Sequence, residues 1–406
     1  MTRTLAQVLA GGLILGTLIS GATSAQNHET HPVRRVVAVG LIPPTAAVAV
    51  DYRTDRVFAL SIVESTLDVL NARSGALLHT QGVNISSPEI AVDETSGHIF
   101  VPSAISNTVD MRNGTTGRLL RSIVLPQRPV AVIPTGARGR VLIVIGTPTP
   151  NGGSIRPQAQ IAVLDGQSGR LVRTTPLSVP GGGLSAAVID APRRHVLLAT
   201  GMTISIVDAV SGAVLHVAQT PRYISALVID GRTDAIFAIG AGAAVRGHVV
   251  RQAVLYSVDS RTGAIAGTRS LGNVILVAAT AAIDERTRRL FIASGLEAVG
   301  ATGFGGGVVV RDIDTGAAIR TAVPGPSVMA LALARQTGRV FVINAFAATQ
   351  MLDARTGAVL RTITKPDQAQ AIAVDERTNR TFIATTLAVH VLDARTGAAV
   401  QTTQVQ

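Results

Sequence analysis

The chain has 406 residues, 47% of them hydrophobic and 15% charged, which excludes a disordered protein and allows a large buried core. It has no cysteine, which excludes disulfide bonds and cysteine-based metal sites. The formal net charge of +11 at pH 7 comes almost wholly from arginine, since Lys365 is the single lysine. Such an excess indicates nucleic acid, an anionic polymer or lipid as the class of partner.

The N-terminal residues have the order of a secretory signal peptide. Arg3 is followed by an apolar run from Val8 to Ile19 and by small residues up to Ala25. We expect residues 1–25 to be a signal peptide and residues 26–33 a polar lead-in. An uncleaved anchor is the alternative, but the run is short against the roughly 20 residues that span a bilayer. The sequence therefore predicts a secreted, periplasmic or cell-surface protein with no nucleic-acid partner and no transmembrane segment after cleavage.

From residue 34 onward the sequence repeats a unit of two hairpins eight times. In the first hairpin an apolar strand ends at an aspartate, except that Pro134 and Ala334 hold this position in two units. An aspartate side chain accepts a hydrogen bond from a backbone N–H two residues on, so we interpret these residues as turn formers. The six aspartates are Asp51, Asp93, Asp190, Asp230, Asp284 and Asp375.

The second hairpin keeps its turn in all eight units. An aspartate or asparagine is followed four residues later by a glycine, which supplies the positive φ that closes a hairpin. Successive copies are 40 to 53 residues apart, which is the spacing of propeller blades. We interpret these positions too as turn formers rather than ligands. The pairs are Asn71 and Gly75, Asn113 and Gly117, Asp165 and Gly169, Asp208 and Gly212, Asp259 and Gly263, Asp312 and Gly316, Asp353 and Gly357, and Asp393 and Gly397.

One such unit cannot bury both faces of its small sheet, whereas a closed ring of units does. We therefore predict that residues 34–406 form a single all-β domain, a β-propeller of four-stranded antiparallel blades, with eight blades and seven as the alternative. The segment 35–40 looks like an additional fourth strand. We expect it to pair into the last blade and close the ring, displacing the polar tail from Gln401 to Gln406.

The repeats also resemble those of a known family. The segments Arg339–Asn344 and Leu352–Val359 are similar to the YVTN-type β-propeller repeats of exported microbial and surface-layer proteins. The resemblance covers nearly the whole chain after the predicted signal peptide. It implies the propeller fold, often with seven blades, and it leaves function open, because such repeats occur in scaffolds, binding proteins and a few enzymes.

Three of the eight units carry insertions between their second and third strands. The two aligned turn positions are 31, 29 and 28 residues apart in units three, five and six, against 18 to 20 in the others. The inserted segments are 146–156, 240–251 and 295–307. In a propeller blade this connection opens on the same end of the ring as the links between blades, so we expect the insertions to lie together. Long loops on one side of a rigid scaffold favour a binding site there.

The residues expected at this site come from the inserted loops and from the links between blades near the central channel. Charged and amide side chains together at the mouth of the central channel can orient a small polar or anionic ligand. A solvated surface without function is the alternative for each residue taken singly. The ten candidates are Glu89, Arg128, Arg156, Arg222, Tyr223, Arg246, His248, Asn273, Lys365 and Asp367.

Basic residues recur on the outermost strand of the units, four residues after the turn glycine. Charge on an exposed edge strand discourages pairing between sheets, and this is the interpretation that we prefer. A basic rim that grips an anionic polymer is the compatible alternative. Six of the eight positions are basic or histidine: His79, Arg121, Arg173, His216, Arg320 and Arg361.

The sequence carries no recognisable catalytic motif. It has neither a Gly-x-Ser-x-Gly elbow nor a His-Glu-x-x-His pair, and His98 and His195 hold a turn position where we expect surface residues. We predict no catalytic residue, no metal and no cofactor. The function that we favour is a ligand- or partner-binding or scaffold module at the cell envelope, with an unknown protein or an anionic polymer or polysaccharide as partner. The alternatives are a propeller-type hydrolase or lyase, and a propeller subunit of a redox complex.

Overall fold

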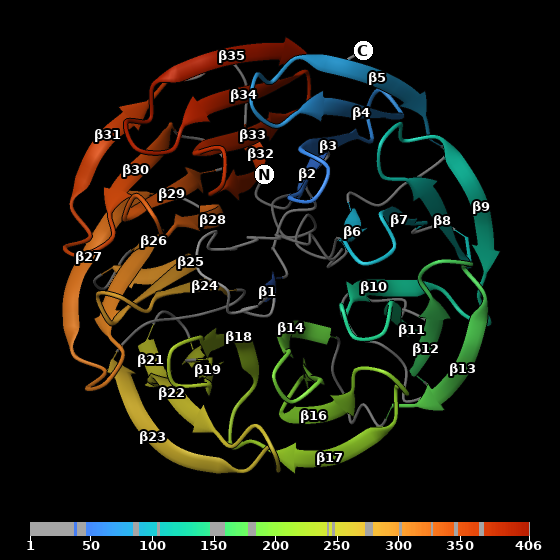
Figure 1. Cartoon of the computed structure of the whole chain (residues 1–406). Coiled ribbons are helices and arrows are strands. Elements are labelled where there is room, and N and C mark those ends of the chain that lie inside the picture. Colours follow the sequence, from blue (N-terminus) through green and yellow to red (C-terminus); the bar gives the residue numbers. More distant parts are fainter. Residues whose placement is uncertain are drawn as a thin grey trace, which may run out of the picture.

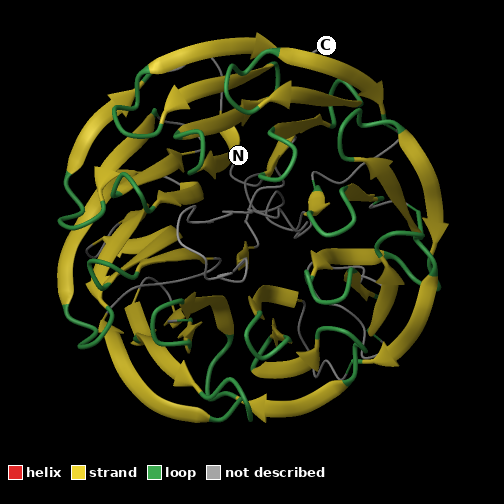
Figure 2. Cartoon of the chain, viewed as in Figure 1, coloured by secondary structure: helices red, strands yellow, loops and turns green. Residues whose placement is uncertain are grey.

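Eight four-stranded antiparallel sheets stand in a ring around a common centre (Figure 1). The computed structural model describes residues 36–38, 46–83, 89–103, 106–146, 159–177, 184–241, 243–245, 248–272, 279–299, 303–325, 328–344, 348–364 and 369–405. Within these ranges the chain consists of strands, turns and links, with no helix (Figure 2). The predicted β-propeller with eight blades is confirmed, and the alternative of seven blades is wrong.

In each of blades 1 to 4 the four strands follow one another in chain order from the centre of the ring to its rim (Figure 1). Blade 1 comprises β2 (Ala46–Asp51), β3 (Arg56–Ser61), β4 (Thr66–Asn71) and β5 (Leu77–Gly82). Blade 2 comprises β6 (Ala91–Asp93), β7 (His98–Pro102), β8 (Thr108–Asn113) and β9 (Leu119–Val124). Blade 3 comprises β10 (Pro129–Pro134), β11 (Arg140–Ile145), β12 (Gln160–Asp165) and β13 (Leu171–Pro176). Blade 4 comprises β14 (Leu184–Asp190), β15 (His195–Thr200), β16 (Thr203–Asp208) and β17 (Val214–Gln219).

Blades 5 to 8 repeat this order, and blade 5 contains an additional two-stranded hairpin. Blade 5 comprises β18 (Ile224–Asp230), β19 (Ala235–Gly240), the hairpin of β20 (Ala243–Val245) and β21 (His248–Arg251), β22 (Ala253–Val258) and β23 (Ile265–Gly272). Blade 6 comprises β24 (Ala279–Asp284), β25 (Arg289–Val299), β26 (Gly303–Asp312) and β27 (Ala318–Gly325). Blade 7 comprises β28 (Val328–Ala334), β29 (Arg339–Asn344), β30 (Thr349–Asp353) and β31 (Val359–Ile363). Blade 8 comprises β32 (Ala369–Asp375), β33 (Arg380–Thr385), β34 (Ala388–Asp393) and β35 (Ala399–Gln404).

The strand before blade 1 does not close the ring. β1 (Val36–Ala38) lies in the middle of the ring and pairs antiparallel with β14, the innermost strand of blade 4 (Figure 1). The prediction that residues 35–40 pair into the last blade is therefore wrong, and so is the displacement of the tail, because Gln401 to Gln404 belong to β35. The physical reason is that β34 already has β35 as its outer partner, whereas β14 presents an unpaired edge toward the centre of the ring.

The apolar core of the described chain is divided among the interfaces between blades. Eight clusters of buried side chains occur, and each joins two neighbouring blades, including blades 8 and 1. The bulkiest members share one position, the third residue of the second strand of a blade, so that the same space is filled at successive interfaces. Six of these residues are phenylalanines: Phe58, Phe100, Phe237, Phe291, Phe341 and Phe382.

The aspartates that end the innermost strands are buried turn formers, as predicted. Asp51 is fully buried, and its carboxylate accepts hydrogen bonds from the Arg53 backbone N–H at 2.9 Å and the Thr54 hydroxyl at 2.7 Å. Asp375 repeats these contacts in blade 8, with Arg377 and Thr378 as donors. These carboxylates thus accept hydrogen bonds from their own turns, and such bonds allow a charged group to be buried.

The eight turn glycines all have positive φ, between 67° and 76°, as the sequence predicts. They also have a second role, because each lies against a side chain of the preceding blade. A Cβ at Gly357 would stand 2.7 Å from Cγ2 of Val310, and one at Gly75 would stand 2.6 Å from Cγ2 of Val391. A glycine at this place therefore permits both the hairpin turn and the close approach of neighbouring blades.

Side chains at the start of the second strands tie neighbouring blades together. The Nε–H groups of Arg289, Arg339 and Arg380 donate to a turn carbonyl of the following blade at 3.2 to 3.3 Å. His98 and His195 hold the same position, are partly buried, and make the corresponding contact to the following blade at 2.9 and 3.2 Å. The sequence predicts surface residues at these positions, and both side chains are partly exposed while their imidazoles replace the arginine in this contact.

Candidate ligand-binding face

All three insertions lie between the second and third strands of their blades, as predicted. They fall between β11 and β12, between β19 and β22, and between β25 and β26. In blade 5 the insertion includes the β20–β21 hairpin, and in blade 6 it lengthens β25 to 11 residues and β26 to 10. Blades 5 and 6 are neighbours in the ring (Figure 1), so two of the insertions belong to adjacent blades. Both follow the second strand of their blade, which puts their connections at the same end of the ring.

The link from blade 4 to blade 5 carries two of the predicted site residues to the base of the β20–β21 hairpin. A guanidinium N–H of Arg222 donates to the carbonyl of Gln252, which joins β21 to β22. The link is fixed by its backbone, since the Thr220 hydroxyl donates to the Arg222 carbonyl at 2.7 Å and Ala241 N–H donates to the Tyr223 carbonyl at 2.8 Å. The hairpin and the link between blades therefore form one connected structure.

A missing side chain at Gly240 makes room for the contact between Arg222 and Tyr256. A Cβ at Gly240 would stand 2.7 Å from the Tyr256 ring and 3.4 Å from Cβ of Arg222. Tyr256 is buried, and burial raises the pKa of its hydroxyl, while the adjacent Arg222 opposes this shift. The tyrosine is consequently neutral at physiological pH and can act as a hydrogen-bond partner of the guanidinium.

Tyr223 is the exposed aromatic residue of this cluster, with 38% of its surface open to solvent. Burial of its hydroxyl raises the pKa of that group, and a hydrogen bond with the side chain of Ser185 in β14 works in the opposite direction. The hydroxyl is therefore anchored to the innermost strand of blade 4, while part of the ring faces solvent. A rigid aromatic surface beside an arginine is the type of group that recognises ligands.

The remaining predicted residues do not all meet at this place. Glu89 is buried, and its carboxylate accepts a hydrogen bond from Val132 N–H at 2.8 Å, which joins the segment before β6 in blade 2 to β10 of blade 3. Arg128 is partly buried, and its carbonyl accepts from Gly146 N–H at 2.9 Å. His248 begins β21, and its side chain lies outside the described part of the structure. Five candidates lie outside the described residues altogether: Arg156, Arg246, Asn273, Lys365 and Asp367.

Of the ten predicted residues, Arg222, Tyr223 and His248 thus belong to neighbouring elements at one place. Tyr256, Gln252 and Ser185 complete that place and are not among the residues predicted from the sequence. Gln252 had a usable signal, because it directly follows the inserted segment. Tyr256 and Ser185 had none, since each stands within a strand whose neighbours in space are known only from the fold.

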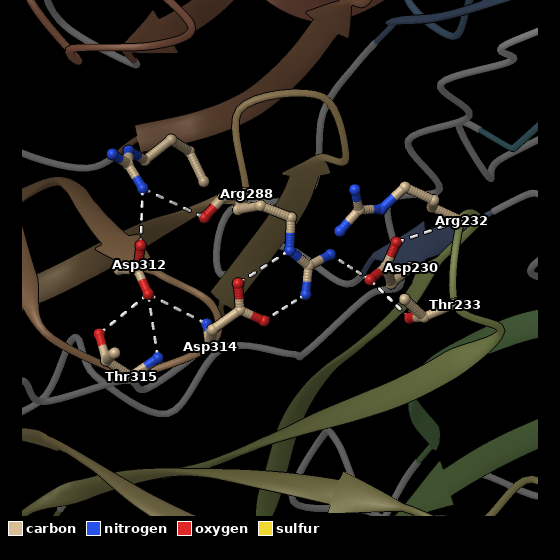
Figure 3. Close-up of polar contacts among 8 residues, drawn as sticks. Asp230, Arg232, Thr233, Arg288, Asp312, Asp314 and Thr315 are labelled. Atoms are coloured by element: carbon tan, nitrogen blue, oxygen red, sulfur yellow. Dashed lines mark hydrogen bonds and ion pairs between the residues drawn. The ribbon is translucent and has the colours of Figure 1, made fainter.

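The opposite end of the ring is held by ion pairs among its own turns. Arg288, in the first turn of blade 6, bonds to Asp230 of blade 5 and to Asp314 of its own blade (Figure 3). The bond from Arg288 holds the pKa of Asp314 below its ordinary value. Burial works to raise the pKa of Asp230, but the bonds from Thr233 and Arg288 outweigh it, and this pKa too is lowered. These charges serve the contact between blades.

Two further observations concern the described residues alone. No group of three or more His, Cys, Asp or Glu residues there has an arrangement that fits a metal ion. In the same part of the chain there is no helix whose length and apolar character would let it cross a membrane.

Comparison with known proteins gives structural matches only. No protein-family model matches the chain, and no curated protein matches it. The computationally designed Ika8 protein matches with a TM-score of 0.59 and 15% identity, over 91% of this chain and 98% of that one. Dihydro-heme d1 dehydrogenase NirN in complex with DHE matches with a TM-score of 0.65 and 12% identity, over 91% and 78%. BamB from Moraxella catarrhalis matches with a TM-score of 0.55 and 14% identity, over 85% and 97%. At these identities the likeness concerns the fold alone, and the chain is an eight-bladed β-propeller.

Proposed function

We propose that this chain is an exported β-propeller that binds a ligand or partner, or serves as a scaffold, at the cell envelope. The observation that carries the proposal is the bond of Arg222, next to the exposed Tyr223, to the base of the inserted β20–β21 hairpin, with the second lengthened hairpin, β25–β26, in the neighbouring blade. The other end is occupied by ion pairs among its own turns. The repeat pattern supports placing the chain among the YVTN-type propellers, and the N-terminal residues support export.

The chemistry of the site favours a partner with both apolar and anionic or hydrogen-bonding groups. The open part of the Tyr223 ring offers a stacking surface, and Arg222 provides positive charge beside it. A peptide of a partner protein has such groups, and so does an anionic polysaccharide of the cell envelope. Because the cluster stands on strand ends and a link fixed by backbone bonds, binding requires little ordering of this part of the protein.

The proposal is tested by co-sedimentation with purified cell-wall material at low and high salt. In the main variant residues 241–252 are replaced by Gly-Met, the two residues that join the equivalent strands of blade 4. A second variant, Tyr223→Ala, leaves the hairpin intact. The control is Leu387→Ala, which alters another exposed apolar residue of a connection between second and third strands, in blade 8.

We expect both site variants to lose retention while the control keeps it. Equal retention of all variants refutes the site, and absence of retention by the unaltered chain refutes binding to this material. Recovery of the exported protein with Gln26 as its first residue tests the predicted cleavage, whereas a first residue upstream of Gln26 contradicts it.

An enzyme is the second candidate, as a hydrolase or lyase with its site on this face or as a subunit of a redox complex. The redox alternative is favoured by one observation, the structural match with NirN. An absorbance titration of the purified chain with heme separates the candidates. Saturable binding that Tyr223→Ala and the hairpin replacement both abolish moves the redox alternative ahead of the binding module.

A further inference from the structure

The outermost strands of the eight blades share an unusual composition. The strands β5, β9, β13, β17, β23, β27, β31 and β35 contain no aspartate or glutamate, although five arginines and two histidines occur in them. They also carry 11 of the 15 large hydrophobic residues that are exposed in the described part of the protein. The rim is therefore apolar and cationic at the same time.

This composition is most concentrated where blade 2 meets blade 3. On β9, Leu119 and Leu120 are about half exposed (50% and 48%), and Val124 is 74% exposed. On β13, Val172 is 40% exposed. We call β9 and β13, with the residue before each, the blade 2–3 rim. Four exposed arginines stand among the apolar residues of this rim: Arg118, Arg121, Arg170 and Arg173.

The carboxylates nearest to the blade 2–3 rim are already neutralised within the scaffold. Asp110 of β8 accepts from the Ser122 hydroxyl at 2.6 Å and pairs with Arg112 at 3.1 Å. Asp165, at the end of β12, pairs with Arg140 at 2.5 Å. Arg121 donates one N–H to the Ser168 carbonyl of blade 3 at 3.3 Å, which aligns the two rim strands. The field at this surface is therefore positive.

We propose that the blade 2–3 rim is a docking surface for an anionic lipid bilayer, which the propeller contacts edge-on. Arginines placed among exposed leucine and valine side chains match the boundary between charged headgroups and acyl chains. A fully hydrophilic polyanion has no apolar groups to pack against the exposed aliphatic side chains. Pairing with the rim of a second copy is opposed by the four arginines that each rim would bring together.

The test is sedimentation of the full chain with vesicles of phosphatidylglycerol and, separately, of phosphatidylcholine. We expect binding to the anionic vesicles alone, weaker at about 1 M salt than at about 0.1 M, because salt screens charges at a surface. Replacing both arginines, as Arg121→Gln with Arg173→Gln, should weaken binding about 25-fold, since each arginine near an anionic surface contributes about fivefold. The variant with lysine at both positions should retain most of the binding.

Two further variants separate lipid from a soluble polyanion. Leu120→Ser and Val124→Ser should each weaken binding to the vesicles about fivefold through lost apolar burial, and leave binding to heparin unchanged. The controls are Arg355→Gln and Val63→Ser, which alter an exposed arginine and an exposed valine away from the rim. Circular dichroism and the unfolding midpoint verify that every variant is folded.

Three results would overturn the proposal. Binding of the unaltered chain to both kinds of vesicle alike excludes recognition of an anionic surface. An equal loss of binding per removed charge in Arg355→Gln and in the double arginine variant shows that net charge, rather than the rim, is responsible. Apolar variants that bind vesicles as well as the unaltered chain indicate a polyanion site instead of a lipid site.

Discussion

The turn glycines allow the packing between blades to be measured apart from the conformation of the turn. Gly357 and Gly136 both have positive φ, of 70° and 66°. They differ in their surroundings, because a Cβ at Gly357 would meet the buried side chain of Val310 at 2.7 Å, whereas a Cβ at Gly136 would meet nothing within 4 Å. Alanine at the two positions therefore shares the backbone cost and differs in the contact.

The expected magnitudes follow from these two contributions. An L side chain in the left-handed region costs about 1–2 kcal/mol, which outweighs the smaller gain from restricting the unfolded chain, so Gly136→Ala should lower stability by about 1 kcal/mol or less. Gly357→Ala adds the cost of overpacking, about 1–3 kcal/mol, because Val310 is buried between two blades and has no free space to enter. We expect Gly357→Ala to be the less stable variant by this difference.

The measurement is equilibrium unfolding in urea, followed by circular dichroism, for both variants and the unaltered chain. Gly263→Ala provides an intermediate case, since its Cβ would stand 3.2 Å from Cβ of Ala218. The order of midpoints should be Gly136→Ala, then Gly263→Ala, then Gly357→Ala. Equal destabilisation of all three would mean that the glycines serve the turn alone, and that the close approach of blades has no energetic weight.

Three further predictions concern the contacts between blades and the site. Arg288→Met should lower the free energy of unfolding at pH 7 by about 3 kcal/mol, because it leaves the buried Asp230 carboxylate unpaired. The native pKa of Asp230 is lowered, so this loss of stability should persist above a pH of about 4 and disappear as the pH falls through the native pKa of Asp230. A loss of stability that does not change with pH would contradict the pairing. Arg380→Leu, at the contact between blades 8 and 1, should lower the free energy of unfolding in urea by about 1 kcal/mol. Arg339→Leu, between blades 7 and 8, should cost the same, because each variant loses equivalent hydrogen bonds. A larger hydrodynamic radius in Arg380→Leu alone would show that closure of the ring depends on this residue. Gly240→Ala should displace Tyr256 and reduce retention on cell-wall material, and unchanged retention would separate Tyr256 from the site.

The fold was predictable because the strand pattern, the turn residues and the spacing of the repeats all indicate the same structure. The aligned aspartates end innermost strands, and the aligned glycines close turns with positive φ, as their chemistry requires. The number of blades followed from counting these turns. The place of β1 was not predictable, because a strand of three small apolar residues fits the edge of any innermost strand, and nothing local selects β14 over the edge of blade 8.

The candidate site was predictable in part. The insertions identify the end of the ring, because their place between second and third strands is fixed by the alignment of turns. The contact of Arg222 with Tyr256 depends on the space that the absent side chain of Gly240 leaves between them, which is a property of packing. Glu89 shows the opposite case, a charged residue expected at the channel mouth whose carboxylate is bonded to the backbone of the next blade.

The most direct test of the proposed binding face is hydrogen–deuterium exchange of the chain with and without solubilised cell-wall fragments. Binding at this face should slow exchange in residues 220–258, which contain Arg222, Tyr223, the β20–β21 hairpin and Tyr256, and in the β25–β26 hairpin. Exchange in the turns around Asp230 is the exception within that range, because these lie at the other end of the ring and should be unaffected. Protection confined to those turns, or to β9 and β13, would contradict the assignment of the binding site to the inserted hairpins.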